Sequence, residues 1–167
     1  MQSLTYGMSH WIPYFGTGTN ATDAYTFRSQ MAPAIVSVWD LRRTDTDYDF
    51  HRSMLGEWRH VSQYYDGDFY PLTTYSNSNE VWMAWQFDKP EISEGVIQAF
   101  RRPESPVVSM TFKLRGLKAD ELYLLTNPDA KDTQQMSGRD LAEQGLSITL
   151  NQPRQAVTIF YKQLPKK

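Results

Sequence analysis

The hydrophobic pattern of this chain changes its period near residue 67, and this change limits the folds that the chain can adopt. Before it, apolar residues recur at steps of three and four, which places them on one face of a helix. They are Phe50, Met54, Trp58, Val61 and Tyr65. After it, apolar and polar residues alternate, as along residues 81–88 and 108–115, which is typical of half-buried strands. We therefore expect an α/β part followed by an all-β part.

The first part predicts two helices and one buried strand. Thr22 or Asp23 can cap a helix that runs to about Met31, and residues 44–65 predict a longer helix. Residues 34–39 form an apolar, β-branched run, as expected for a strand covered on both faces in a parallel sheet or barrel. We expect residues 1–15 to be irregular and residues 16–19 to form a turn.

The second part predicts an antiparallel sandwich. Residues 67–79 are rich in Ser, Thr and Asn and indicate a linker, so we expect domains at 1–66 and 80–167 on either side of it. Short strands separated by Pro and Gly are typical of sandwiches. The expected strands are 81–88, 96–100, 108–115, 122–125, 146–150 and 156–162, with one helical turn at 137–144.

Composition argues against several partners. The formal net charge is -2 and no basic block interrupts the chain, so we expect no nucleic-acid partner. No apolar run approaches the roughly 20 residues of a membrane span, and the N-terminus lacks the basic start and apolar core of a signal peptide. We therefore expect no membrane partner. For the chain as written, and if Met1 is its true start, we expect a cytoplasmic location; a secreted or periplasmic location stays open for the parent. The chain has no cysteine, which excludes disulfides and thiolate metal sites.

One short segment matches a nucleotide-binding pattern but lacks the strand that must precede it. Residues 16–21 fit G-x-G-x-x-A, and Asp40 follows some twenty residues later. The fingerprint needs an apolar strand directly before its first Gly, and Pro13 interrupts that segment. We therefore expect no dinucleotide cofactor.

Metal and acyl-transfer sites are also disfavoured. Asp45, Asp47 and Asp49 resemble the start of a calcium loop, but Phe50 and Gly56 stand where the loop needs Gly and Glu. The three histidines lack metal-ligand spacing, and no serine lies in a G-x-S-x-G turn. The sequence thus predicts no metal, no cofactor and no serine nucleophile.

Four residues are candidates for contact with a sugar. Asp40 follows the expected buried strand, at the position where barrel enzymes place functional groups. It is equally suited to capping the loop or to pairing with Arg42 or Arg43. Trp11 and Tyr14 can stack on sugar rings, and Arg28 can hold hydroxyls or a carboxylate. The alternative is that these three side chains anchor the irregular segment.

Several motifs in order resemble one enzyme family. They are YGMSHWIPYFGTGT, YTFRSQMAP, WDLRR, YYDGDFYPLT, WMAWQFDKPEISEGVIQAFRR and LRGL. Together they resemble the C-terminal part of the bacterial α-galactosidases of glycoside hydrolase family 36, from Tyr6 to about Leu164. The resemblance implies the last strands and helices of a (β/α)8 barrel followed by a C-terminal antiparallel β-domain.

The resemblance also implies a chemistry whose main residues lie elsewhere. Such enzymes are retaining: one carboxylate attacks the anomeric carbon and a second protonates the leaving oxygen. In this family both aspartates lie earlier in the barrel, and neither matches a position here. We therefore expect the chain alone to be inactive, with the remaining barrel portion and α-galactoside sugars as partners of the parent enzyme.

A second hypothesis treats the chain as a free-standing β-domain. Trp82, Trp85 and Tyr123 would then form an aromatic platform for carbohydrate. The two tryptophans are three residues apart and so face opposite sides of a strand, which disfavours one platform. A purely structural domain without a ligand is the third hypothesis.

Overall fold

The chain divides into two compact units, residues 1–66 and 67–167. The structure is a computed structural model that describes residues 2–40, 42–130 and 132–165. Within these ranges no helix is both long and apolar enough to cross a bilayer.

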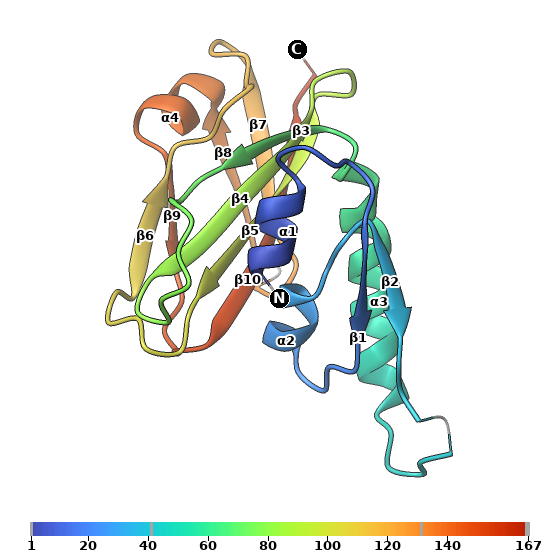
Figure 1. The fold of residues 1–167 in the computed structure, drawn as a ribbon. Coiled ribbons are helices and arrows are strands. Elements are labelled where there is room, and N and C mark those ends of the chain that lie inside the picture. Colours follow the sequence, from blue (N-terminus) through green and yellow to red (C-terminus); the bar gives the residue numbers. More distant parts are fainter. Residues whose placement is uncertain (1, 41, 131, 166–167) are drawn as a thin grey trace. The chain divides into compact units, whose positions relative to one another are not determined.

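The N-terminal unit contains two parallel strands with helices before, between and after them (Figure 1). Gly16 pairs with Ala34 and Thr19 with Ser37, so both strands end at the same edge. Parallel strands need a crossover, and a short helix supplies part of it. The elements in order are α1 (Gln2–Met8), β1 (Gly16–Thr19), α2 (Ala24–Ser29), β2 (Ala34–Ser37), α3 (Tyr48–Val61) and a 3-10 turn (Ser62–Tyr64).

Aspartates begin two of these helices, as short polar side chains do at helix N-termini. Asp23 accepts a hydrogen bond from the backbone N–H of Thr26 at 2.9 Å, which confirms the helix expected after residue 22. Asp47 accepts from the N–H of Phe50 at 2.9 Å. The long helix therefore begins at Tyr48, a few residues later than residue 44, while its regular α-turns end at Val61.

Three expectations for the N-terminal unit were wrong. Residues 2–8 form α1 because their polar side chains have partners far along the chain; the Gln2 amide, for example, donates to Ser29 Oγ at 2.9 Å. Residues 16–19 form a strand because their backbone pairs with β2. Strand β2 is not covered on both faces: Ala34 and Ile35 are half-buried, whereas Val36 is 63% exposed and Ser37 is also exposed.

The C-terminal unit is built from antiparallel strands (Figure 1). Its main sheet has six strands in the order β3-β4-β5-β10-β7-β8, and β6 pairs separately with β9. Their bounds are β3 (Asp68–Pro71), β4 (Trp82–Lys89), β5 (Glu94–Arg101), β6 (Ser109–Phe112), β7 (Leu122–Asn127), β8 (Asp132–Ser137), β9 (Leu146–Thr149) and β10 (Gln155–Gln163). Between β8 and β9 lies helix α4 (Gly138–Glu143), which confirms the helical turn expected there.

One apolar core joins the large sheet to the β6–β9 ribbon. It includes Trp82 and Ile97 from the sheet and Phe112 and Ile148 from the ribbon, so side chains from two layers interdigitate as in a sandwich. The expected all-β architecture is confirmed for this unit.

Two strands were missed in the sequence. Strand β3 lies within the segment predicted as a linker and pairs with β4, Phe69 opposite Phe87. Strand β8 has the sequence DTQQMS and is mostly exposed at the edge of the sheet. Neither segment alternates apolar with polar residues, so only pairing with a neighbour reveals them.

Candidate functional site

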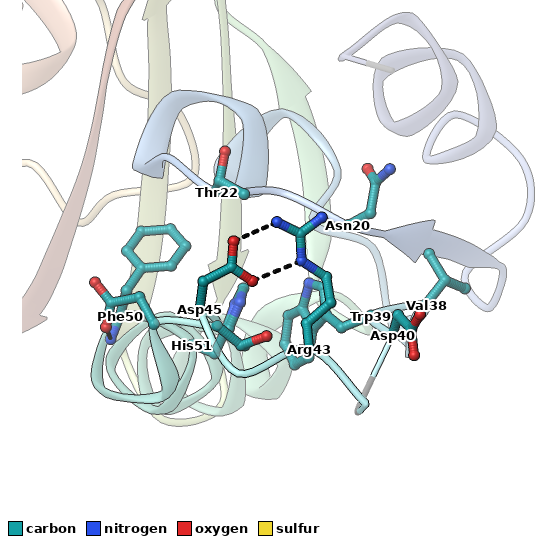
Figure 2. A pocket seen from close by; sticks show the side chains of 11 residues that line it. Asn20, Thr22, Val38, Trp39, Asp40, Arg43, Asp45, Phe50 and His51 are labelled. Atoms are coloured by element: carbon teal, nitrogen blue, oxygen red, sulfur yellow. Dashed lines mark hydrogen bonds and ion pairs between the residues drawn. The ribbon is translucent and has the colours of Figure 1, made fainter.

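A pocket of about 390 Å³ lies where the two parallel strands of the N-terminal unit end (Figure 2). Residues following β1 and β2 form part of its wall, and the first turn of α3 forms the rest. This volume falls within the roughly 300–1,000 Å³ of small-molecule sites. The lining residues are Asn20, Thr22, Val38, Trp39, Asp40, Arg43, Asp45, Thr46, Asp47, Phe50 and His51.

Two stacked rings form one wall of the pocket. The centroids of the Trp39 and His51 rings lie 3.6 Å apart with an interplanar angle of 32°. His51 is only 4% exposed, and its ring also meets Phe50 edge to face at 5.3 Å. The first turn of α3 thus holds the imidazole against the indole that follows β2.

Both rings carry a polar atom that is shielded from solvent and unpaired. Trp39 Nε1 and His51 Nδ1 have no hydrogen-bond partner among the described residues. Leaving a buried donor or acceptor unsatisfied costs about 1–3 kcal/mol, so most proteins avoid it. Two such atoms beside one pocket make it a candidate binding site.

The imidazole is uncharged at neutral pH. Burial lowers the pKa of His51 below its ordinary value, and the nearby Asp47 carboxylate opposes this only in part. A neutral imidazole has one N–H and one lone pair. His51 can therefore accept a hydrogen bond at one ring nitrogen, which a protonated histidine cannot do.

The acids of the pocket already have partners. Asp40 accepts two hydrogen bonds from the Arg42 guanidinium at 2.8 and 2.9 Å, and these bonds lower the pKa of Asp40. Asp45 pairs in the same way with Arg43, as Figure 2 shows. These exposed carboxylates stay ionised and are held by arginines, so none has the raised pKa of a general acid.

The predicted site residues separate in the structure. Asp40 lines the pocket, and its pairing with Arg42 is one of the two roles expected for it. Trp11 and Tyr14 are 73% and 74% exposed and do not line this pocket. Their contact with sugar stays a prediction.

Arg28 is buried rather than open to a ligand. It is 4% exposed and donates through Nε and Nη2 to the two carboxylate oxygens of Glu57, each at 2.8 Å. This bidentate pair joins α2 to α3. Of the two roles expected for Arg28, the structure supports the structural anchor.

Trp39 and His51 were not predicted as site residues. Trp39 stands next to Asp40 at the end of the predicted strand, and this position was a usable signal. His51 was discounted because the three histidines lack metal-ligand spacing. The described residues contain no group of three or more His, Cys, Asp or Glu that could hold a metal ion.

The aromatic platform proposed for the β-domain does not exist. Trp82 and Tyr123 are 3% and 2% exposed and belong to the core shared with the ribbon. Trp85 is fully buried on the opposite face of β4, where its ring lies 5.0 Å from that of Phe100. None of the three rings is open to a sugar.

A polar network lies inside the C-terminal unit instead. The Tyr161 hydroxyl donates to Asp88 Oδ1 at 2.6 Å and accepts from Gln86 Nε2 at 2.7 Å. Asp88 is 2% exposed, and its Oδ2 has no partner among the described residues. Burial raises the pKa of Asp88, although the Tyr161 hydrogen bond acts in the opposite direction.

The chain resembles known proteins in both sequence and fold. Residues 82–161 match the glycosyl hydrolase family 36 C-terminal domain. Among solved structures, the galactosidase domain of the α-galactosidase–sucrose kinase AgaSK has a TM-score of 0.73 and 18% identity, covering 98% of this chain and 24% of that one. No curated protein sequence matches the chain.

Two further structures come from Geobacillus stearothermophilus. The family 36 α-galactosidase AgaB has a TM-score of 0.68 and 15% sequence identity. A variant of the family 36 α-galactosidase AgaA in complex with stachyose has a TM-score of 0.70 and 16% sequence identity. Each covers 89% of this chain, which spans 21% of each of them. At these identities the matches show the fold: a short α/β part and an antiparallel β-domain, as in the C-terminal region of these enzymes.

Proposed function

We propose that this chain, whose residues 82–161 match the glycosyl hydrolase family 36 C-terminal domain, is the C-terminal part of a retaining α-galactosidase-like enzyme. Its first unit supplies late barrel strands and part of the rim of the sugar site. Its second unit is a structural β-domain. The catalytic carboxylates belong to earlier barrel strands that this chain does not contain.

The position of the pocket carries this proposal. In barrel enzymes the active site lies at the carboxyl ends of the parallel strands. Here Asn20 follows β1, Trp39 and Asp40 follow β2, and all three line one pocket. An aromatic ring beside amide and carboxylate groups suits a sugar, which offers apolar ring faces and many hydroxyls.

The acids of the pocket support a binding role rather than catalysis. Retaining hydrolysis needs one ionised carboxylate free to attack and one carboxylic acid with a raised pKa. Asp40 and Asp45 are each held by an arginine, and Asp47 caps α3. None of the three is suited to either catalytic role.

The coding sequence upstream of the Met1 codon tests the proposal. We expect an open reading frame that continues upstream and encodes the earlier barrel strands with two catalytic aspartates. An in-frame stop codon directly before Met1 would contradict it and favour a free-standing protein.

A further inference from the structure

We propose that Asp88 is a proton-binding site within the C-terminal unit: β3 pairs firmly with β4 while this carboxyl is neutral, and loss of its proton loosens β3. The inference goes beyond the proposed function, in which the second unit has only a structural role. It gives that unit a response to pH.

An ionised Asp88 lacks the partners that a buried charge needs. The residue is 2% exposed. Its Oδ1 accepts a hydrogen bond of 2.6 Å from Tyr161, whereas its Oδ2 has no partner among the described residues. Buried charges are normally paired with an opposite charge, but no ion pair between described residues includes Asp88.

Gln86, the amide of this network, has no donor to spare. Its Nε2 donates to the Tyr161 hydroxyl at 2.7 Å and to the Arg115 carbonyl at 2.8 Å, which uses both of its N–H groups. Its Oε1 accepts from the backbone N–H of Arg115 at 2.9 Å. Gln86 therefore cannot turn toward Asp88 Oδ2 without giving up a bond that it already makes.

Negative charges act on Asp88 from neighbouring segments. Asp68 lies directly opposite it in the pairing of β3 with β4, and like charges in this position destabilise a sheet. Burial is the main cause that raises the pKa of Asp88; the Tyr161 hydrogen bond opposes it, and Asp68 and Glu91 raise the pKa further.

The other strands around Asp88 supply no compensating positive charge. On β5, Gly95 lies opposite it. Arg115 is exposed and lowers the pKa of Tyr70, but forms no ion pair with Asp88. The remaining titratable groups are phenols whose pKa is raised by burial, so they stay neutral. They are Tyr70 on β3, Tyr123 on β7 and Tyr161 on β10.

The bond to Tyr161 suits both forms of Asp88. When the carboxyl is ionised, the hydroxyl donates to Oδ1. When Oδ1 carries the proton, the bond reverses, and the hydroxyl can donate instead to the Phe87 carbonyl, 3.5 Å away. The unpaired Oδ2 is then an uncharged carbonyl oxygen, which costs less to bury than a charged one.

Backbone and ring atoms cover the unpaired oxygen. A Cβ added to Gly116 would lie 2.7 Å from Asp88 Oδ2 and 3.3 Å from Tyr70 Cε2, so Gly116 and the Tyr70 ring pack close to the carboxyl. Ionisation attracts water to Oδ2 and repels Asp68. Both effects act on β3, which carries Asp68 and Tyr70, so β3 separates from β4 before the rest of the sheet opens.

The C-terminal unit therefore loses stability as the pH rises through the titration of Asp88. Folding raises the pKa of Asp88 above its ordinary value of 3.8, so the folded unit binds more protons than the unfolded chain between these two values. The contribution of the proton is fully present below about 3.8 and is lost as the pH rises through the folded-state pKa.

Thermal unfolding of the full chain between pH 4 and 8 tests the inference, with the C-terminal unit followed through the NMR signals of its β4 amides. Asp88→Asn keeps the shape of the neutral carboxyl and cannot ionise. Its Tm should gain about 4–8 °C on that of the wild type as the pH rises. Asp132→Asn, which alters an exposed carboxylate on β8, is the control and should gain nothing.

Two measurements on the wild type keep the test independent of whether Asp88→Asn folds. The NMR signal of the Asp88 carboxyl carbon should titrate with a midpoint above 3.8. Hydrogen exchange, corrected for intrinsic rates at each pH, should show that the Phe69 amide on β3 loses protection as the pH rises. The Leu124 amide on β7 should keep its protection.

Three results would overturn the inference. They are an Asp88 midpoint at or below 3.8, no gain in Tm by folded Asp88→Asn as the pH rises, and protection of β3 that does not change with pH. None of them bears on the upstream reading frame, which decides the proposed function separately.

Discussion

The Tyr161 hydroxyl donates to Asp88 Oδ1 at 2.6 Å across the interior of the C-terminal unit. The bond joins β10 to β4, two strands that both pair with β5. Gln86 extends the network by donating to the same hydroxyl and to the Arg115 carbonyl, at 2.7 and 2.8 Å. This buried network stabilises the sheet only while each member keeps its partner.

Tyr161→Phe should therefore destabilise the C-terminal unit by about 1–3 kcal/mol, because it leaves a buried carboxyl without its donor. Urea unfolding or the amide exchange of β10 measures the loss. Tyr75→Phe is the control: its exposed hydroxyl bonds to Asn77 in a loop, and its removal should change stability by less than about 0.5 kcal/mol. Equal effects of both variants would contradict the importance of the network.

His51 should titrate below the ordinary histidine pKa of 6.5. Burial depresses its pKa in the folded state, so the unfolded chain binds more protons around pH 6 and stability falls as the pH drops below about 6.5. The Asp47 carboxylate opposes the shift, and Asp45 and Arg43 also line the pocket. NMR of the histidine ring signals between pH 4 and 8, roughly the window in which histidine titrates, measures the folded-state pKa of His51 directly.

Comparison with His51→Gln removes the contributions of other groups to the pH dependence. The stability difference between wild type and variant should shrink as the pH falls through this window. A folded-state pKa for His51 at or above 6.5 contradicts the account of a neutral imidazole acceptor.

Glu57→Gln should destabilise the N-terminal unit by roughly 3–5 kcal/mol, because it removes the negative charge that is paired with the buried Arg28 guanidinium. Amide exchange along α3 provides the measurement. Arg52→Ala removes an exposed ion pair with Asp49 and serves as the control, with an expected loss of no more than about 1 kcal/mol. A loss of that small size for Glu57→Gln would show that the Arg28 pair is not a structural anchor.

Gly95→Ala should destabilise the β-domain by about 1–3 kcal/mol or more through overpacking. An added Cβ would lie 2.2 Å from the Tyr161 hydroxyl oxygen and 2.4 Å from the Phe87 carbonyl oxygen. Gly56→Ala is the matched control, since nothing lies within 4 Å of its added Cβ. Gly56→Ala should stabilise α3 by about 0.5–1 kcal/mol. Thermal unfolding should therefore show a lower Tm for Gly95→Ala and a higher Tm for Gly56→Ala than for the wild type.

Some elements of the fold could be predicted because their sequence pattern is local. The steps of three and four from Phe50 to Tyr65 reflect one helix face, and the alternation along β4 and β6 reflects two faces of a sheet. Strand β1 could not be predicted, because Gly16–Thr19 resembles a turn until its backbone meets β2. Strand β8 has a single apolar residue, Met136, which packs against the core. One apolar residue gives no alternating pattern, so the pairing of β8 with β7 leaves no signal in the sequence.

The site was harder to predict than the fold. Asp40 was identified as a candidate because it directly follows a predicted strand, so its position in the sequence was enough to predict it. His51 lies eleven residues further on, in a helix, and only the folded chain brings its ring onto Trp39. The absence of a hydrogen-bond partner at Nδ1 depends on every neighbour of that atom, which no sequence pattern contains.

The central claim is that this chain forms part of an α-galactosidase-like site but lacks its catalytic carboxylates. Hydrolysis of p-nitrophenyl α-galactopyranoside, measured for the chain alone and for the chain extended by its upstream coding sequence, tests this most directly. We predict no hydrolysis by the chain alone and hydrolysis with retention of configuration by the extended protein. Turnover by the 167-residue chain itself, or none by a folded extended protein, would contradict the account.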